Sequence, residues 1–150
     1  MGAAPPAVPI VGRMTPARSP KPVAEWTDPR HRRGYAGERI AIAHLLREGW
    51  RIEAHRFRVA RHDLDLVARR GRLVAFIEVK TRRSRQFGSG LEAIGWRKRA
   101  VLACLAEVWR ERFGSPGDQY RFDVVVVEEG VSPSPQVTHI TDAWRGVEKW

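Results

Sequence analysis

The sequence predicts a single mixed α/β domain, in which helices flank a central β-sheet in the order α-β-β-β-α-β-β. Three observations support this class. Apolar residues recur at helical spacing in two long segments, 34–48 and 91–113. Shorter segments between and after them alternate in polarity or are continuously apolar, as strands are. At 150 residues, the chain can bury one ordinary core without disulfides or zinc.

The first helix is predicted over Gly34–Glu48, with Gly49 ending it. At about 100° per residue, Glu38 falls in the middle of its apolar stripe. The other members of this stripe are Ala41, Ile42, Leu45 and Leu46. Glu38 is therefore expected either to face a site or to complement the helix dipole near the N-terminus.

Three strands are predicted next, and the last two are joined by a tight hairpin at Arg69-Arg70-Gly71. The strands cover Trp50–Val59, Asp63–Ala68 and Arg72–Lys80. Thr81–Gly90 follows as a polar, basic loop.

The second helix is predicted over Leu91–Phe113, and the glycines and proline of 114–117 end it. Tyr120–Glu128 is expected to be a central strand because it is apolar on both faces. A short strand over Val137–Ile140 follows, and Asp142 is expected to cap a final helical turn through Trp144.

Residues 1–29 are predicted to form a disordered tail, since they hold seven of the ten prolines and show little periodicity. The folded domain is accordingly expected over residues 30–150.

The charge balance favours a polyanionic partner. Lys and Arg number 27 against 17 Asp and Glu, which leaves a net charge of +10. Residues 30–100 carry 19 basic and 7 acidic side chains, whereas residues 101–150 carry 5 and 8. A basic face on the first two thirds is the expected result.

The single cysteine, Cys104, excludes an intramolecular disulfide and any multi-cysteine zinc site. It is expected to be buried in the second helix. No stretch has the length of a membrane span, and no apolar signal core begins the chain. A cytoplasmic protein without a membrane partner is therefore predicted.

The segment 76–80 contains the side chains that are most informative about function. The two-residue period of a strand places Glu78 and Lys80 on one face. Antiparallel pairing across the hairpin can bring Asp65 to Glu78, with Asp63 beside it, so three carboxylates are expected in one small volume. Their repulsion calls for Mg²⁺ or Mn²⁺, with Asp65 and Glu78 as ligands. The alternative is a cross-strand ion-pair network.

Asp65, followed after a hairpin by Glu78-Val79-Lys80, resembles the PD-(D/E)xK signature of the restriction-endonuclease-like superfamily. The longer resemblance, over about residues 32–144, is to the YraN-like family of small bacterial proteins, which are related to archaeal Holliday junction resolvases. The segments that carry it are Gly34-Tyr35-Ala36-Gly37-Glu38, Asp63-Leu64-Asp65-Leu66-Val67, Phe76-Ile77-Glu78-Val79-Lys80-Thr81-Arg82 and Arg121-Phe122-Asp123-Val124-Val125.

This resemblance implies a restriction-endonuclease-like core and a metal-dependent nuclease acting on structured or branched DNA rather than RNA. Asp65, Glu78 and Lys80 would be catalytic, with Glu38 as the helix carboxylate. Related resolvases work as dimers, so a homodimer would be required for symmetric cleavage. The chain departs from the family pattern at His62-Asp63, where Gly-Glu is usual, and at Arg56, where Asn is usual.

Basic residues after the third strand are predicted to contact nucleic-acid phosphates. They are Arg82, Arg83 and Arg85, together with Lys98 at the start of the second helix. Solvated surface charge is the alternative for each. At the level of function, the alternatives are a DNA- or RNA-binding module without catalysis and an adaptor that docks through the acidic C-terminal third.

Overall fold

The computed structural model describes residues 29–83, 94–130 and 132–145. Within these ranges the elements follow the predicted order α-β-β-β-α-β-β. Their bounds are α1 Pro29–Arg47, β1 Arg51–Val59, β2 His62–Arg70, β3 Leu73–Arg82, α2 Trp96–Phe113, β4 Gln119–Glu128 and β5 Gln136–Trp144. The predicted tail lies outside the described residues, except that Pro29 already belongs to α1.

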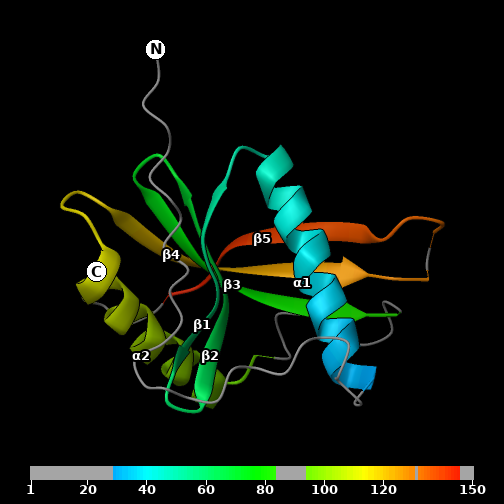
Figure 1. The fold of residues 1–150 in the computed structure, drawn as a ribbon, viewed down its shortest axis with the longest axis horizontal. Coiled ribbons are helices and arrows are strands. Elements are labelled where there is room, and N and C mark those ends of the chain that lie inside the picture. Colours follow the sequence, from blue (N-terminus) through cyan, green and yellow to red (C-terminus); the bar gives the residue numbers. More distant parts are fainter. Residues whose placement is uncertain (1–28, 84–93, 131, 146–150) are drawn as a thin grey trace.

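The five strands form one mixed sheet in the order β1-β2-β3-β4-β5. β3 and β4 are parallel, and the other neighbours are antiparallel. A parallel pair needs a crossover connection, which α2 supplies. β4 is buried on both faces, as predicted, but β3 holds the central place in the sheet. Figure 1 shows the strand directions rotating across the sheet, as expected of its natural twist.

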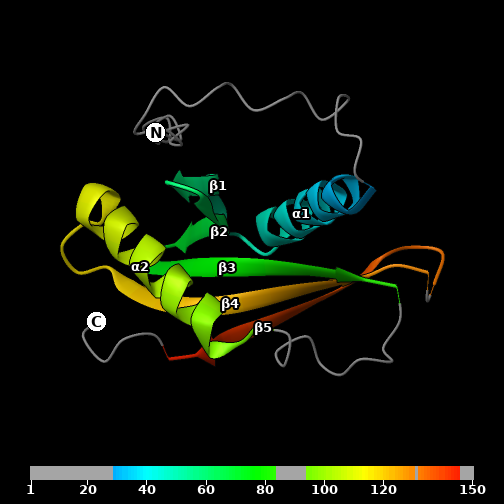
Figure 2. The ribbon, with the colours of Figure 1, turned by 90° about the horizontal axis from the view of Figure 1, so that it is seen from below.

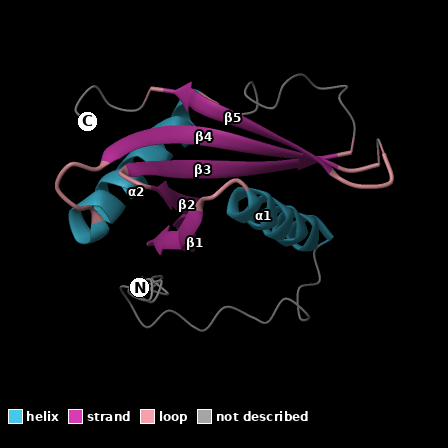
Figure 3. Cartoon of the chain, turned by 90° about the horizontal axis from the view of Figure 1, so that it is seen from above, coloured by secondary structure: helices cyan, strands magenta, loops and turns pink. Residues whose placement is uncertain are grey.

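The sheet separates two apolar clusters, each covered by one helix. Val74 and Phe76 of β3 pack with residues of α2, whereas Ala75 and Ile77 pack with Ala41 of α1. The alternation of β3 therefore assigns one face of the sheet to each helix. Figures 2 and 3 show the strands passing between the two helices.

A glycine allows α1 to approach β3 closely. A Cβ atom added to Gly37 would overlap the Thr81 hydroxyl oxygen and lie 3.2 Å from the Thr81 Cβ. At Gly34, three residues earlier in the same helix, an added Cβ would meet nothing within 4 Å. Gly37 thus brings the helix against the end of β3 and carries its neighbour Glu38 there.

Several boundaries differ from the prediction, and α1 begins at Pro29 instead of Gly34. The β2–β3 hairpin turns at Gly71 and Arg72, because β2 continues to Arg70. α2 begins at Trp96 instead of Leu91, which lies outside the described residues. Gly95 is the N-cap and is extended, with φ −69° and ψ 166°, so the helix begins after it although the preceding residue is apolar.

The last strand is longer than predicted, and its end is not a helical turn. β5 runs to Trp144, with an irregularity in its pairing to β4 between Phe122 and Val124. Asp142 has φ 51°, and its N–H donates to Oδ1 of Asp123 at 2.9 Å. The prediction that Asp142 caps a helix was wrong, because this bulge keeps the strand paired until the Trp144 ring stacks on Phe122.

Surface and core assignments were partly confirmed. Ala41 and Leu45 are fully buried, but Leu46 is 55% exposed because the stripe of α1 is narrower than predicted. Cys104 is exposed, not buried, because α2 turns its neighbours on either side toward the sheet. Arg121 and Asp123, which share a face of β4, form an ion pair at 2.8 Å. Neither described helix combines the length and the apolar character that crossing a bilayer requires.

Candidate functional site

The site lies where β2 and β3 part. Backbone pairing between them runs from the hairpin only as far as Leu66 and Ile77, although both strands continue. The next residue of β2, Asp65, instead uses its side chain: Oδ2 accepts a hydrogen bond from the Val79 N–H at 2.8 Å. The Asp65 carboxylate therefore takes the place of a backbone carbonyl at the point of separation.

The packing of β2 shows the same break. Leu64 belongs to the cluster covered by α2, and Leu66 belongs to the cluster covered by α1. Residues two apart in a regular strand share a face, so β2 rotates at Asp65. The sequence predicted that Asp65 approaches Glu78 by regular pairing, whereas the structure brings it there by ending that pairing.

Glu78 is the most constrained carboxylate of the site. It is 5% exposed, and its Oε1 lies 3.8 Å from Nζ of Lys80 and 3.6 Å from Nζ of Lys98. Its Oε2 is buried and has no hydrogen-bond partner among the described residues. When both carboxyl groups are ionised, such an oxygen is costly to bury, and either a proton shared with the neighbouring Asp65 side chain or a cation would satisfy it.

Both carboxylates resist ionisation here. Burial is the main reason that the pKa of Asp65 lies well above its usual range, and the negative charge of Glu78 adds to this rise. The hydrogen bond from the Val79 N–H opposes it. Burial also raises the pKa of Glu78, against the lowering effect of the Lys98 and Lys80 ammonium groups. Two carboxylates with raised pKa values and a shared volume are typical of functional sites.

Lys80 lies on the same face of β3 as Glu78, as its spacing predicted. Its side chain is 33% exposed, so the ammonium reaches both Glu78 and solvent. β3 is held in place by parallel pairing to β4 along its length, with Lys80 opposite Val126. Lys98 approaches the same carboxylate from the first turn of α2. Its contact with Glu78 was not predicted, because nothing in the sequence relates the two.

Glu38 is buried at 5% exposure and points to β1. It accepts hydrogen bonds from Nε and Nη2 of Arg56 at 3.0 and 2.8 Å, and its Oε2 lies 3.3 Å from Nε2 of His55. Burial raises the pKa of Glu38, but the bonds from His55 and Arg56 outweigh it and lower the pKa. Glu38 therefore stays charged, and its charge contributes to the raised pKa of Asp65.

The predicted third carboxylate does not join the pair. The described residues contain no group of three or more His, Cys, Asp or Glu side chains placed to hold a metal ion. Asp63 instead lines a separate hollow with Lys98, because the first half of β2 leaves β3. The negative charge of Asp63 still acts on the pair, because it contributes to the raised pKa values of Asp65 and Glu78.

The predicted phosphate contacts differ in their surroundings. Arg82 pairs with the buried Glu128 at 3.4 Å, and its side chain is only 19% exposed. Arg83 is exposed, and the side chain of Lys98 is 43% exposed. Arg85 lies outside the described residues. A role in binding nucleic acid stays a prediction for all four.

Together these features define a mixed α/β protein with a carboxylate pair, one member of which is buried, and a lysine at the point where two strands of its sheet separate. The model of the family described as "Uncharacterised protein family UPF0102" matches residues 37–127, which include Glu38, the carboxylate pair and Lys98. The chain belongs to this UPF0102 family, the YraN-like group that its motifs resemble.

Related chains align with about two thirds to three quarters of this sequence. A UPF0102 protein of Rhodococcus jostii is 36% identical over 111 residues, which cover 74% of this chain and 94% of the relative. A UPF0102 protein of Symbiobacterium thermophilum is 43% identical over 97 residues, 65% of this chain and 82% of that one. One of Mesorhizobium japonicum is 39% identical over 117 residues, 77% and 89% of the two chains.

Proposed function

We propose that this protein is a metal-dependent endonuclease that hydrolyses phosphodiester bonds in structured or branched DNA. The observation that carries the proposal is the pairing of half-buried Asp65 with buried Glu78, in which Glu78 Oε2 has no hydrogen-bond partner among the described residues and Lys80 stands alongside. The net charge of +10 supports a nucleic-acid substrate.

The donor set fits Mg²⁺ or Mn²⁺. These hard cations prefer oxygen ligands and keep several waters, so two carboxylates suffice as side-chain ligands. Asp65 and Glu78 would hold the ion, which would occupy the side of Glu78 that lacks a partner and relieve the repulsion that raises the pKa of Asp65. When bound, such an ion polarises a phosphoryl oxygen and lowers the pKa of a bound water.

The protein groups around the pair have separate tasks. The Val79 N–H fixes the direction of the Asp65 carboxylate. The Lys80 ammonium, 3.8 Å from Glu78 Oε1 and partly exposed, can donate hydrogen bonds to a phosphate oxygen and hold the attacking water in line. Arg56 keeps Glu38 ionised near Asp65, and the negative charge of Glu38 favours a cation there.

A binding module without catalysis is the second candidate. Glu78 Oε1 lies within 4 Å of both Lys80 and Lys98, which an internal ion-pair network would also show. Such a module binds phosphates through basic side chains and needs no metal. About six phosphate contacts on duplex DNA predict a log–log salt slope near −5.

The test is cleavage of labelled four-way junction, flap, single-stranded and duplex DNA in Mg²⁺ or Mn²⁺. We expect the wild type to cleave at least one substrate, and both Asp65→Asn and Lys80→Ala to bind without cleaving. Glu107→Gln, which removes the same charge from the exposed face of α2, serves as the control. Full cleavage by both site variants would refute the proposal, and metal-independent binding without cleavage would favour the binding module.

The assembly and location follow from the proposed reaction. Symmetric cleavage of a junction requires two sites, so we expect a homodimer on such a substrate, which sedimentation velocity of the protein–DNA complex would detect. The exposed thiol of Cys104 is compatible with the reducing cytoplasm, where DNA is available.

A further inference from the structure

A hollow of about 340 Å³ adjoins the carboxylate pair and is not used by the proposed chemistry. It lies between the tip of the β1–β2 hairpin and the first turns of α2. Its lining residues are Arg61, His62, Asp63, Arg97, Lys98 and Val101. Arginine or lysine supplies three of these side chains and aspartate one, so its formal charge favours an anion.

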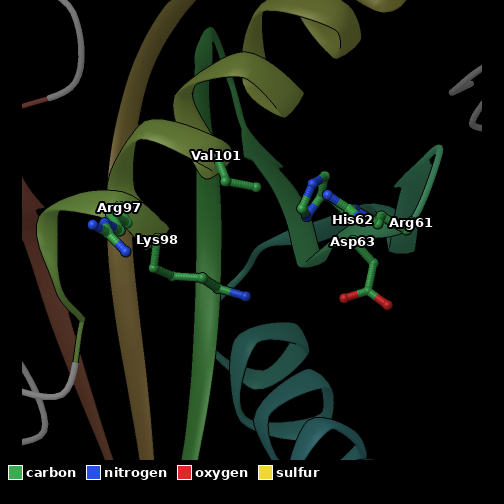
Figure 4. Close-up of a pocket in the computed structure, with 6 residues that line it drawn as sticks. All are labelled: Arg61, His62, Asp63, Arg97, Lys98 and Val101. Atoms are coloured by element: carbon green, nitrogen blue, oxygen red, sulfur yellow. The ribbon is translucent and has the colours of Figure 1, made fainter.

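Lys98 connects the hollow to the site. Its Nζ lies 3.6 Å from Oε1 of Glu78 while its stem lines the hollow. Figure 4 shows this side chain extending over β3 toward the side on which Asp63 lies, with Arg61 and His62 on that side and Arg97 on the other. Arg61 and Arg97 thus lie on opposite sides of Lys98, so a phosphate held by Lys98 would have a guanidinium on either side.

The first turn of α2 carries Arg97 and Lys98, two of the residues that line the hollow. Its N-cap, Gly95, offers no side-chain hydrogen bond, and no acidic residue occupies the first turn. The first backbone N–H groups of a helix lack intrahelical partners and favour a negative group. The turn is held in position because Arg99 donates from Nε to the Ile94 carbonyl at 3.0 Å.

An aromatic ring stands beside these cations. Trp96 is 74% exposed, whereas the described tryptophans of the core, Trp50, Trp109 and Trp144, are buried. The guanidinium of Arg97 lies 5.2 Å from the centroid of the Trp96 ring. A solvent-exposed indole next to cations that line a hollow is the arrangement with which proteins stack an unpaired base while holding its phosphate.

We propose that the hollow and Trp96 bind an unpaired DNA strand: the hollow takes a backbone phosphate, and Trp96 stacks on a base next to it. The inference rests on the proposed function only in that this strand would continue to the carboxylate pair through Lys98. It deepens that function by naming DNA with a single-stranded arm as the substrate class. In duplex DNA the bases are stacked on one another, so no base face is available for Trp96 to stack on.

Binding without metal tests this inference separately from cleavage. The full chain is titrated in EDTA against labelled oligo(dT) and against a blunt duplex, with fluorescence anisotropy as the readout. Trp96→Ala should weaken oligo(dT) binding by about fivefold or more, the lower end of what stacking on one base contributes, and should leave duplex binding within a factor of about two. Trp96→Phe should retain most of the affinity for oligo(dT).

Leu46→Ala is the matched control, because Leu46 is the other large apolar side chain that the described residues expose, and it lies on α1. It should bind both ligands as the wild type does. Arg61→Gln and Arg97→Gln should each reduce the log–log salt slope on oligo(dT) by about 0.7, the value for one phosphate contact on a single strand.

The outcomes separate the two proposals. Equal weakening of single-strand and duplex binding by Trp96→Ala, no weakening, or no binding of oligo(dT) by the wild type would overturn the strand-binding inference. If the wild type cleaves DNA in Mg²⁺ while Trp96→Ala binds oligo(dT) normally, the inference fails and the nuclease stands. If Trp96→Ala selectively loses oligo(dT) and the wild type cleaves nothing, the inference stands and the nuclease proposal fails.

Discussion

Replacing Gly37 by alanine should destabilise the protein, although alanine is the better helix former. Two effects of opposite sign compete. Alanine stabilises a helix interior by about 1 kcal/mol relative to glycine. The new methyl group would overlap the Thr81 hydroxyl oxygen, and overpacking of this kind costs about 1–3 kcal/mol. Relief requires either another rotamer of Thr81 or a movement of α1 away from β3, which would carry Glu38 with it.

Gly34 provides the matched control for this substitution. It lies in the same helix, one turn earlier, and an added Cβ would meet nothing within 4 Å. Gly34→Ala therefore receives the same gain in helix propensity without the clash. The difference in the free energy of unfolding between the two alanine variants isolates the clash, and we expect it to be about 1–3 kcal/mol.

Urea denaturation of both variants, followed by circular dichroism, measures this difference. A third variant, Gly37→Ala with Thr81→Ala, removes the hydroxyl and leaves only the Thr81 Cβ position at 3.2 Å. Relative to Thr81→Ala alone, the Gly37 substitution should then cost little, which gives a coupling of about 1–2 kcal/mol. Equal stability of Gly34→Ala and Gly37→Ala would refute the close contact between α1 and β3.

Three further outcomes are expected. Mn²⁺ should raise the thermal unfolding midpoint of the wild type but not of Asp65→Asn, as measured by scanning fluorimetry. Arg56→Ala should lower the free energy of unfolding by about 2 kcal/mol in urea, because buried Glu38 keeps only His55. Hydrogen bonds from its partners lower the pKa of Asp123 despite its burial, so its carboxylate stabilises the fold above about pH 4. That contribution is lost as the pH falls through the lowered pKa, so Asp123→Asn should flatten the acid limb of a stability–pH profile.

Each of these outcomes has a clear contrary result. An equal Mn²⁺ shift in Asp65→Asn would exclude Asp65 as a required ligand. Wild-type stability of Arg56→Ala would mean that Glu38 does not depend on that guanidinium. An unchanged acid limb in Asp123→Asn would assign the loss of stability at low pH to other carboxylates.

The regular part of the site could be read from the sequence. β3 pairs with β4 along its whole length, so its two-residue period holds without a break and places Glu78 and Lys80 on one face. The same regularity made the apolar residues of β3 recognisable as a strand. The charge pattern of Arg121 and Asp123 was equally readable, since both lie on β4.

The irregular parts of the fold and the site could not be predicted from the sequence, because they depend on contacts between residues that are distant in sequence. Arg56, Ala60 and Asp142 adopt positive φ values, a conformation usually signalled by glycine or asparagine. Arg56 instead gains two hydrogen bonds to buried Glu38, which offset the strain. Such compensation comes from a helix distant in sequence. The exposure of Cys104 similarly depends on how α2 is placed on the sheet.

The parting of β2 from β3 explains both the candidate site and the hollow beside it. Had the ladder continued past Leu66, a backbone carbonyl would satisfy the Val79 N–H, and Asp65 would have no fixed partner at that position. Because the ladder stops, the Asp65 carboxylate is fixed next to Glu78, and the hairpin tip with Arg61 and Asp63 is free to lie against α2. One local departure from regular pairing thus fixes the orientation of the Asp65 carboxyl group beside buried Glu78 and, next to them, leaves room for a basic hollow. A nuclease needs this combination, because the cation and the phosphate backbone must be held side by side.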